Sequence, residues 1–158
     1  MSLPFHPNRD NERISSERIN QFLHAAQYYV PKARLVLDIG CGHGDLVHAS
    51  NAAGIRMLGV DLRDVFLYDR QWFVHADAAY LPFKSRSVDV ICEHFFIDDI
   101  MMLQEDAPRK IIAALAEMQR VLKKGGAVIS SPQWYNFAPE LGCLLVSDAY
   151  TYKVYKKK

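Results

Sequence analysis

Three glycines alternate along a short stretch that directly follows an apolar run, residues 36–39. They are Gly40, Gly42 and Gly44, and glycine both bends sharply and lets a ligand lie against backbone N–H groups. Asp38, the acid just before them, would repel a phosphate and attract an ammonium group. We therefore interpret this stretch as the binding site of a ligand with a cationic end, rather than as a tight strand-to-helix turn without a ligand.

Two further acids follow at the spacing of a nucleoside site. Asp61 comes about 20 residues after the glycines, where a carboxylate can accept hydrogen bonds from both hydroxyls of a ribose. Asp77 ends the next apolar run, and Ala78 and Ala79 behind it leave room for a flat ring. Asp77 is either an acceptor for an exocyclic amine, as in adenine, or a turn or N-cap residue.

The glycine spacing separates two kinds of nucleotide site. A dinucleotide-binding turn has the pattern G-x-G-x-x-G and holds a pyrophosphate at a helix N-terminus. This chain has G-x-G-x-G with an acid in front of it. The pattern favours a ligand with an adenosine end and an amino-acid end over the nicotinamide cofactor of a dehydrogenase.

Short apolar strands that alternate with helical segments must position these residues. Helices are predicted from apolar spacings of three to four residues, and strands from short runs rich in β-branched residues. We predict helices over residues 14–30, about 44–53 and 107–124, and strands over residues 34–40, 56–61, 72–77, 88–95 and 127–131. Such strands are buried on both faces, so the predicted fold class is α/β, a doubly wound, mostly parallel sheet with helices on both faces.

The last part of the chain is ambiguous. Residues 137–146 fit a helix, and GCLLV among them fits a strand. Residues 149–155 alternate apolar side chains, which predicts a final antiparallel strand at the edge of the sheet. The length fits one domain. We divide it into an N-terminal helical segment, a cofactor-binding core and a shortened C-terminal part, residues 1–33, 34–131 and 132–158.

The composition argues against several classes of function. The 158 residues carry 19 basic and 18 acidic side chains, a formal charge of +1, so nucleic acid and membrane surfaces are not the expected partners. The terminal YKVYKKK is interpreted as a solvated end rather than a phosphate-binding patch. Three widely spaced cysteines predict neither a metal site nor a disulfide framework. Because no apolar run fits a signal sequence or a membrane helix, we expect a cytoplasmic protein.

Taken together, the motifs resemble those of class I S-adenosylmethionine-dependent methyltransferases, of the small methyltransferase-11 type. VLDIGCGHG matches the family's first motif, and GVDL matches the acidic segment after it. ADAAYLPFKSRSVDVI matches the segment from the adenine contact to the fourth strand, and EMQRVLKKGGAVI matches the helix and strand that follow. The resemblance covers about residues 36–131. It implies a Rossmann-like fold, S-adenosylmethionine as cofactor, S-adenosylhomocysteine as product, and methyl transfer to an unidentified acceptor.

The resemblance also implies contacts for the methionine half of the cofactor. Asp38 and the backbone of Gly40 and Gly42 would hold this half. Cys41 in the same turn is either a further contact or a small packing residue. Glu93 would lie at the cofactor's amino end, where the substrate site begins.

The adenosine half has its own implied contacts. Asp61 would bind the ribose hydroxyls, and Leu62 would pack on the face of the adenine. Asp77 would accept a hydrogen bond from the adenine amine, and Ala78 would offer its backbone N–H.

A general base is needed only if the acceptor must lose a proton, since methyl transfer is an in-line displacement at an activated methyl. Glu93 and His94 are the tentative catalytic residues, although His94 equally fits a packing role between sheet and helix. Asp98 and Asp99 are either further bases or helix N-caps. Aromatic residues in SPQWYNF, 131–137, either wall a substrate pocket or cover the sheet.

The chain departs from the family pattern in two places. No [DN]PPY-like sequence follows the predicted strand 88–95, which disfavours the families that methylate the amino groups of adenine or glutamine. Few residues follow Ser131, so the substrate site is open, suited to a large partner, or completed by a second subunit in a homodimer. A non-catalytic, cofactor-binding regulator or partner subunit is the alternative to an enzyme.

Overall fold

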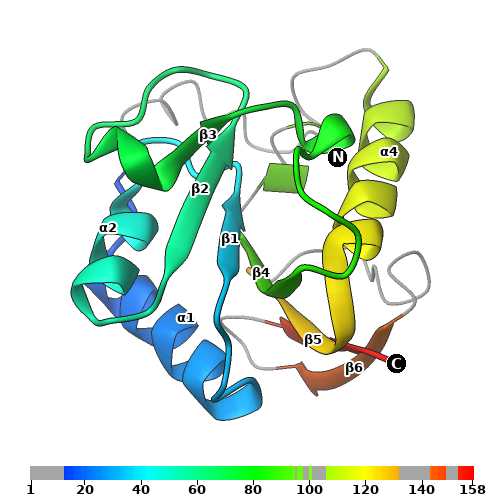
Figure 1. Ribbon diagram of the computed structural model, residues 1–158, viewed down its shortest axis with the longest axis horizontal. Coiled ribbons are helices and arrows are strands. Elements are labelled where there is room, and N and C mark those ends of the chain that lie inside the picture. Colours follow the sequence, from blue (N-terminus) through cyan, green and yellow to red (C-terminus); the bar gives the residue numbers. More distant parts are fainter. Residues whose placement is uncertain (1–12, 95, 98–99, 101–105, 132–142, 149–152) are drawn as a thin grey trace, which may run out of the picture.

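A computed structural model describes residues 13–94, 96–97, 100, 106–131, 143–148 and 153–158. In this part of the chain a seven-stranded sheet has the order β3-β2-β1-β4-β5-β7-β6 (Figure 1). Neighbours among β1 to β5 are parallel, and β7 is antiparallel to both of its neighbours. The strands are β1 Val36–Ile39, β2 Met57–Asp61, β3 Phe73–His75, β4 Val88–Glu93, β5 Leu122–Ser130, β6 Cys143–Asp148 and β7 Lys153–Lys157.

The strand order reverses between β1 and β4. The chain runs from β1 through β2 to β3 toward one edge, and β4 then returns to the other side of β1. Ligands of open parallel sheets bind beyond the carboxyl ends of the strands at such a reversal. The predicted doubly wound sheet is confirmed, and its reversal point lies where the glycines follow β1.

Helices cover both faces of the sheet, as predicted. Figure 1 shows α1 Ser16–Tyr29 and α2 Asp45–Ala52 on one side and α4 Ala107–Val121 on the other. Phe22 of α1 and Leu46 of α2 pack in one apolar cluster, whereas Leu115 and Met118 of α4 pack in the second. Apolar residues of α4 recur every three to four positions, so one face of the helix is buried on the sheet.

The junction between α4 and β5 differs from the prediction. The helix ends at Val121 rather than at residue 124, and β5 begins at once with Leu122 rather than at residue 127. Leu122 pairs with Val88 of β4 and is fully buried there. A Cβ on Gly126 would lie 2.8 Å from the carbonyl oxygen of Asp89. The glycines therefore belong to an irregular strand that passes close to β4, not to the end of a helix.

The described C-terminal part contains two strands, whereas the sequence was compatible with either one strand or two. The strand alternative for GCLLV is confirmed as β6. The final strand is antiparallel as predicted, but its predicted place at the edge is wrong, since β7 lies between β5 and β6. Val154 and Tyr155 are fully buried in opposite apolar clusters, so both faces of β7 are covered. Residues 137–142 and 149–152 lie outside the described residues.

The remaining elements agree with the predictions within a few residues at each end. No helix in the described ranges is long and apolar enough to cross a membrane.

Candidate functional site

The glycine turn after β1 adopts left-handed backbone at all three alternating positions. The φ angles are 73° at Gly40, 51° at Gly42 and 87° at Gly44. A Cβ on Gly42 would have no atom within 4 Å, so space is open above this peptide. A Cβ on Gly44 would lie 2.1 Å from the ring of Phe66, which closes the other side of the turn. The turn therefore needs glycine for its conformation, and its exposed side is free for a ligand.

Asp61 ties the end of β2 to this turn. Its Oδ2 accepts a hydrogen bond from the Gly42 N–H at 2.8 Å, and its Oδ1 accepts one from the Arg63 N–H at 2.8 Å. The Arg63 guanidinium lies 3.4 Å from the same Oδ1. Both carboxylate oxygens are thus satisfied within the protein, although the side chain borders a cavity.

Three acids meet at the carboxyl ends of three neighbouring strands. Asp38 of β1, Asp61 of β2 and Glu93 of β4 are 4%, 6% and 1% exposed. Burial, and after it the negative charges of Asp61 and Glu93, raises the pKa of Asp38 to about 8. The Glu93 carboxylate accepts a hydrogen bond from the Ser130 hydroxyl of β5. A cationic group brought to this place would relieve the repulsion among the acids.

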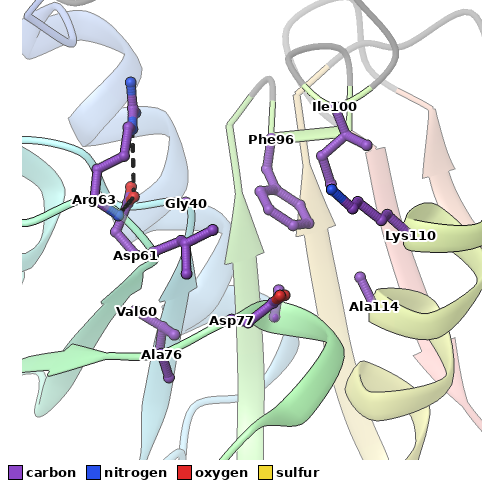
Figure 2. A pocket seen from close by; sticks show the side chains of 12 residues that line it. Gly40, Val60, Asp61, Arg63, Ala76, Asp77, Phe96, Ile100, Lys110 and Ala114 are labelled. Carbon is purple, nitrogen blue, oxygen red and sulfur yellow. Dashed lines mark hydrogen bonds and ion pairs between the residues drawn. The ribbon is translucent and has the colours of Figure 1, made fainter. Parts of the chain in front are cut away.

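A cavity of about 170 Å³ opens beside Asp61, one of these three acids. Figure 2 shows Asp61 and Arg63 along one wall, and Phe96, Lys110 and Ala114 along the other. The lining comes from the ends of β1 and β2, from the segment after β3, from the segment after β4, and from α4. It consists of Gly40, Val60, Asp61, Leu62, Arg63, Ala76, Asp77, Ala78, Phe96, Ile100, Lys110 and Ala114.

The predicted adenine contacts lie together in this cavity. Leu62 is 60% exposed and presents an apolar surface at its rim. Asp77 precedes a 3₁₀ turn, η3 Ala78–Tyr80, and its Oδ1 accepts a hydrogen bond from the Ala79 N–H at 2.9 Å. Asp77 is therefore an N-cap residue and a cavity residue at once, so the two interpretations of the sequence are compatible.

The family of the chain follows from a match over the same elements. A family model described as a methyltransferase domain matches residues 37–130, from β1 to the end of β5 and more than half of the chain. The chain belongs to the class I S-adenosylmethionine-dependent methyltransferases. S-adenosylmethionine is accordingly the cofactor of this methyltransferase.

Solved structures share the fold of this methyltransferase. The PH0226 protein of Pyrococcus horikoshii aligns with a TM-score of 0.68 at 19% identity, covering 95% of this chain and 94% of that one. The 1,6-didemethyltoxoflavin-N1-methyltransferase of Burkholderia thailandensis, solved with bound S-adenosylhomocysteine, aligns with a TM-score of 0.67 at 15% identity. It covers 89% of this chain and 79% of that one.

Among curated proteins, the demethylmenaquinone methyltransferase of Clavibacter sepedonicus is 33% identical over 103 residues. The match covers 60% of this chain and 39% of that relative. Across the first four such relatives, this methyltransferase spans between 39% and 53% of the other protein's length.

His94 lies where the packing interpretation expects it. Its Nε2 accepts a hydrogen bond from the Arg18 guanidinium of α1 at 3.0 Å, and its ring meets the Phe22 ring edge-on at 5.9 Å between centroids. Because a guanidinium only donates, the neutral imidazole of His94 must carry its proton on Nδ1. His94 thus joins α1 to the carboxyl end of β4.

Cys41 also has a packing role. Burial raises the pKa of its thiol, so the side chain is neutral. A Cβ on Gly59 of β2 would lie 2.6 Å from the Cys41 sulfur, which shows how closely this side chain packs on the strand. Glycine at position 59 therefore leaves the space that the Cys41 side chain occupies against β2.

The sequence did not point to the far wall of the cavity. Phe96, Ile100, Lys110 and Ala114 belong to no motif, and only the packing of α4 and of the segment after β4 brings them to the site. The apolar spacing along α4 was the available signal, but it marks the buried face without indicating the residues beside it. The candidate bases Asp98 and Asp99 and the aromatic residues of 132–137 lie outside the described residues.

Proposed function

We propose that this methyltransferase moves the methyl group of S-adenosylmethionine to a ring carbon of a hydroxylated aromatic acceptor of the quinol kind. The observation that carries cofactor binding at this place is the meeting of Asp38, Asp61 and Glu93. Buried acids this close together destabilise a ligand-free protein. A ligand with a cationic end and two hydroxyls offsets that cost, and S-adenosylmethionine has both.

The open space above Gly42 supports binding of the methionine half of the cofactor at this turn. Asp38 and Glu93 receive the ammonium group in this proposal, and the backbone of Gly40, Cys41 and Gly42 lies along the methionine chain. When bound, the cofactor would supply a methyl group activated by a sulfonium, and the rest of the cofactor would leave as a neutral thioether. Orientation of the two reactants by the protein contributes up to about 7–11 kcal/mol in good cases.

For the adenosine half, we assign the ribose to Asp61 and the adenine to the cavity beside it. Asp61 exchanges its hydrogen bonds from Gly42 and Arg63 for those of the ribose hydroxyls. Leu62 packs on the ring face, and Ala78 offers its backbone N–H. The second carboxylate oxygen of Asp77 accepts from the exocyclic amine, because the first is used by Ala79.

The acceptor class is supported by chemistry and by relatives. Phe96 and Ile100, from the segment after β4, are apolar and border the cavity assigned to the cofactor, which suits a flat apolar ring next to it. A hydroxyl group on such a ring makes the adjacent ring carbon nucleophilic once it is ionised. The relative from Clavibacter sepedonicus is named a demethylmenaquinone methyltransferase, and its acceptor is therefore a quinone compound.

No dedicated general base is assigned among the described residues. Glu93 is used at the cofactor's amino end, and the Nε2 of His94 already accepts from Arg18. A hydroxylated ring that loses its phenol proton to solvent water can be methylated at carbon without a protein base. The methylated carbon then gives up its proton while the ring oxygen takes one up, which restores the phenol, and this is a further reason to prefer such an acceptor over an amine or alcohol.

The proposed function is tested first by calorimetric titration with S-adenosylhomocysteine. Asp61→Ala removes charge-assisted hydrogen bonds worth roughly 1.5–3 kcal/mol, so its affinity should fall by about 10- to 150-fold. Asp64→Ala is the matched control, because Asp64 is an exposed acid of the same loop that pairs only with Arg70 in the described structure. Equal affinities of the two variants would place the ribose elsewhere.

Turnover then tests the acceptor. Radiolabelled S-adenosylmethionine is incubated with reduced 1,4-naphthoquinol and, separately, with an aromatic amine of similar size. Carbon methylation of the quinol supports the proposal. Methylation of the amine alone overturns the acceptor class, and tight cofactor binding without turnover on either compound supports the non-catalytic alternative.

A further inference from the structure

The segment that follows β3 carries two proposed adenine contacts but has little regular structure of its own. Only three residues, those of η3, are helical between β3 and β4 after Asp77. Its backbone is nevertheless fixed directly to α4. Leu81 donates its N–H to Glu117 Oε2 at 2.8 Å and accepts a hydrogen bond from Arg120 at 2.9 Å.

Arg120 reaches one step further along the same segment. Its guanidinium also donates to the Phe83 carbonyl oxygen at 2.8 Å. Two further hydrogen bonds, of 2.6 and 2.8 Å, join it to the Glu117 carboxylate. The fork geometry of arginine lets one side chain serve these acceptors together, which a lysine cannot do. The hydrogen bond from Arg120 lowers the pKa of Glu117, so the pair stays charged.

The contact between Glu117 and Leu81 lies close to the cavity in both segments that it joins. Ala78 of η3 and Ala114 of α4 both line the cavity, and the two elements pack directly on each other. Leu81 and Glu117 follow Ala78 and Ala114 by three positions each. A contact at this place holds η3 against α4, and hence fixes where Asp77 and Ala78 lie at the border of the cavity.

We propose that Glu117 and Arg120 are positioning residues for the cofactor, because they hold the backbone of Leu81 and Phe83 and so keep η3, with Asp77 and Ala78, in the position on α4 that the adenine contacts require. The inference rests on the proposed adenine contacts at Asp77 and Ala78. Neither side chain touches the cavity, so both act through the backbone of the segment.

The pair is suited to positioning more than to global stability. The Arg120 and Glu117 side chains are 34% and 20% exposed, so water can replace many of their hydrogen bonds when one is removed. Leu81 stays buried in the apolar cluster at 4% exposure and keeps the segment attached. Loss of the pair should therefore loosen η3 while the sheet and helices remain folded.

The test compares Arg120→Ala with Arg109→Ala, an exposed arginine of the same helix that does not line the cavity. Two ligands are titrated, S-adenosylhomocysteine and S-inosylhomocysteine, in which a carbonyl replaces the adenine amine. We expect Arg120→Ala to bind S-adenosylhomocysteine at least about tenfold more weakly. We also expect it to discriminate less between the two ligands, while Arg109→Ala matches the unchanged protein. Once an acceptor has been identified, Arg120→Ala should show a higher KM for the cofactor than the unchanged protein and the same kcat at saturating cofactor.

Two results would overturn the positioning role. One is unchanged affinity in Arg120→Ala. The other is an equal loss for both ligands together with a lowered unfolding temperature, which marks a structural residue only. If Arg120→Ala fails to fold, Arg120→Lys is used, which keeps the charge and loses the fork, with an intermediate loss of discrimination expected. Absence of discrimination in the unchanged protein would instead reject the adenine contacts on which the inference rests.

Discussion

Asp38 shows at the scale of one residue how the site opposes the stability of the ligand-free protein. Its carboxyl is 4% exposed and lies near two other acids. Burial and those charges raise its pKa to about 8, so it is protonated over much of the neutral range until a cation binds. Cofactor binding at pH 7 should therefore release a proton from Asp38.

A pH-dependent stability follows from the same residue. The pKa of Asp38 is higher in the folded than in the unfolded chain, so the folded state holds an extra proton between about pH 4 and pH 8. Stability contributed by this group falls as the pH rises through that window. Asp38→Asn should therefore unfold at a temperature at least about 3 °C higher than the unchanged protein at pH 9, with little difference at pH 4.

Thermal unfolding without ligand at both pH values measures this effect, and titration with S-adenosylhomocysteine provides the control. The variant lacks the charge for the ammonium group, so it should bind more weakly although it is more stable. A destabilised Asp38→Asn at pH 9 would mean that the carboxylate is stabilised in the free protein by contacts that the asparagine loses.

At the scale of secondary-structure elements, the junction between α4 and β5 shows how a glycine can position a helix. No loop separates the two, and the glycines after Lys124 let the strand run close to β4. The Cβ contact predicted for Gly126 is with backbone atoms of Asp89 and Lys123, which cannot turn aside as a side chain would. This junction fixes where α4 ends against the sheet, and so helps to hold the helix that lines the cavity.

Gly126→Ala should therefore destabilise the fold by about 1–3 kcal/mol, as is usual for overpacking of a filled site. Urea unfolding measures the change as a lower midpoint with an unchanged slope. Gln119→Ala, on the exposed side of α4, is the control and should leave the midpoint nearly unchanged. A midpoint equal to that of the control would show that β4 and β5 can separate at this point without cost.

At the scale of the whole molecule, the C-terminal strands complete the sheet. β7 pairs with β5 through residues 153–156 and with β6 on its other side. Its two central side chains reach both apolar clusters. The last strand of the chain therefore contributes to the core on both faces of the sheet.

Ending the chain after Asp148 should accordingly abolish cooperative unfolding, because β6 would lose its described neighbour in the sheet and β5 would lose one of its two neighbours. Circular dichroism during heating, together with binding of a hydrophobic dye, measures this loss. A chain that lacks only Lys158, which is exposed and lies after β7, should behave as the full chain does. Cooperative melting of the shorter chain would show that the five parallel strands form a sufficient core.

The local features of the site could be predicted because they depend on short stretches of sequence. The turn at Gly40, Gly42 and Gly44 needs positive φ angles, and glycine adopts them most readily. Asp61 and Asp77 follow short apolar runs, and the carboxyl ends of parallel strands all meet at one edge of a sheet. The sequence by itself therefore determined the fold class and which acids come to the carboxyl ends of the strands at the candidate site.

The tertiary structure decided what depends on contacts between distant residues. It brought Lys110 and Phe96 to the cavity, joined Arg18 to His94, and linked Arg120 to the backbone of Leu81. It also placed β7 inside the sheet, because apolar alternation indicates which faces of a strand are buried but not which strands lie beside it. Strand order and side-chain partners arise from packing between segments far apart in the chain, which no local spacing records.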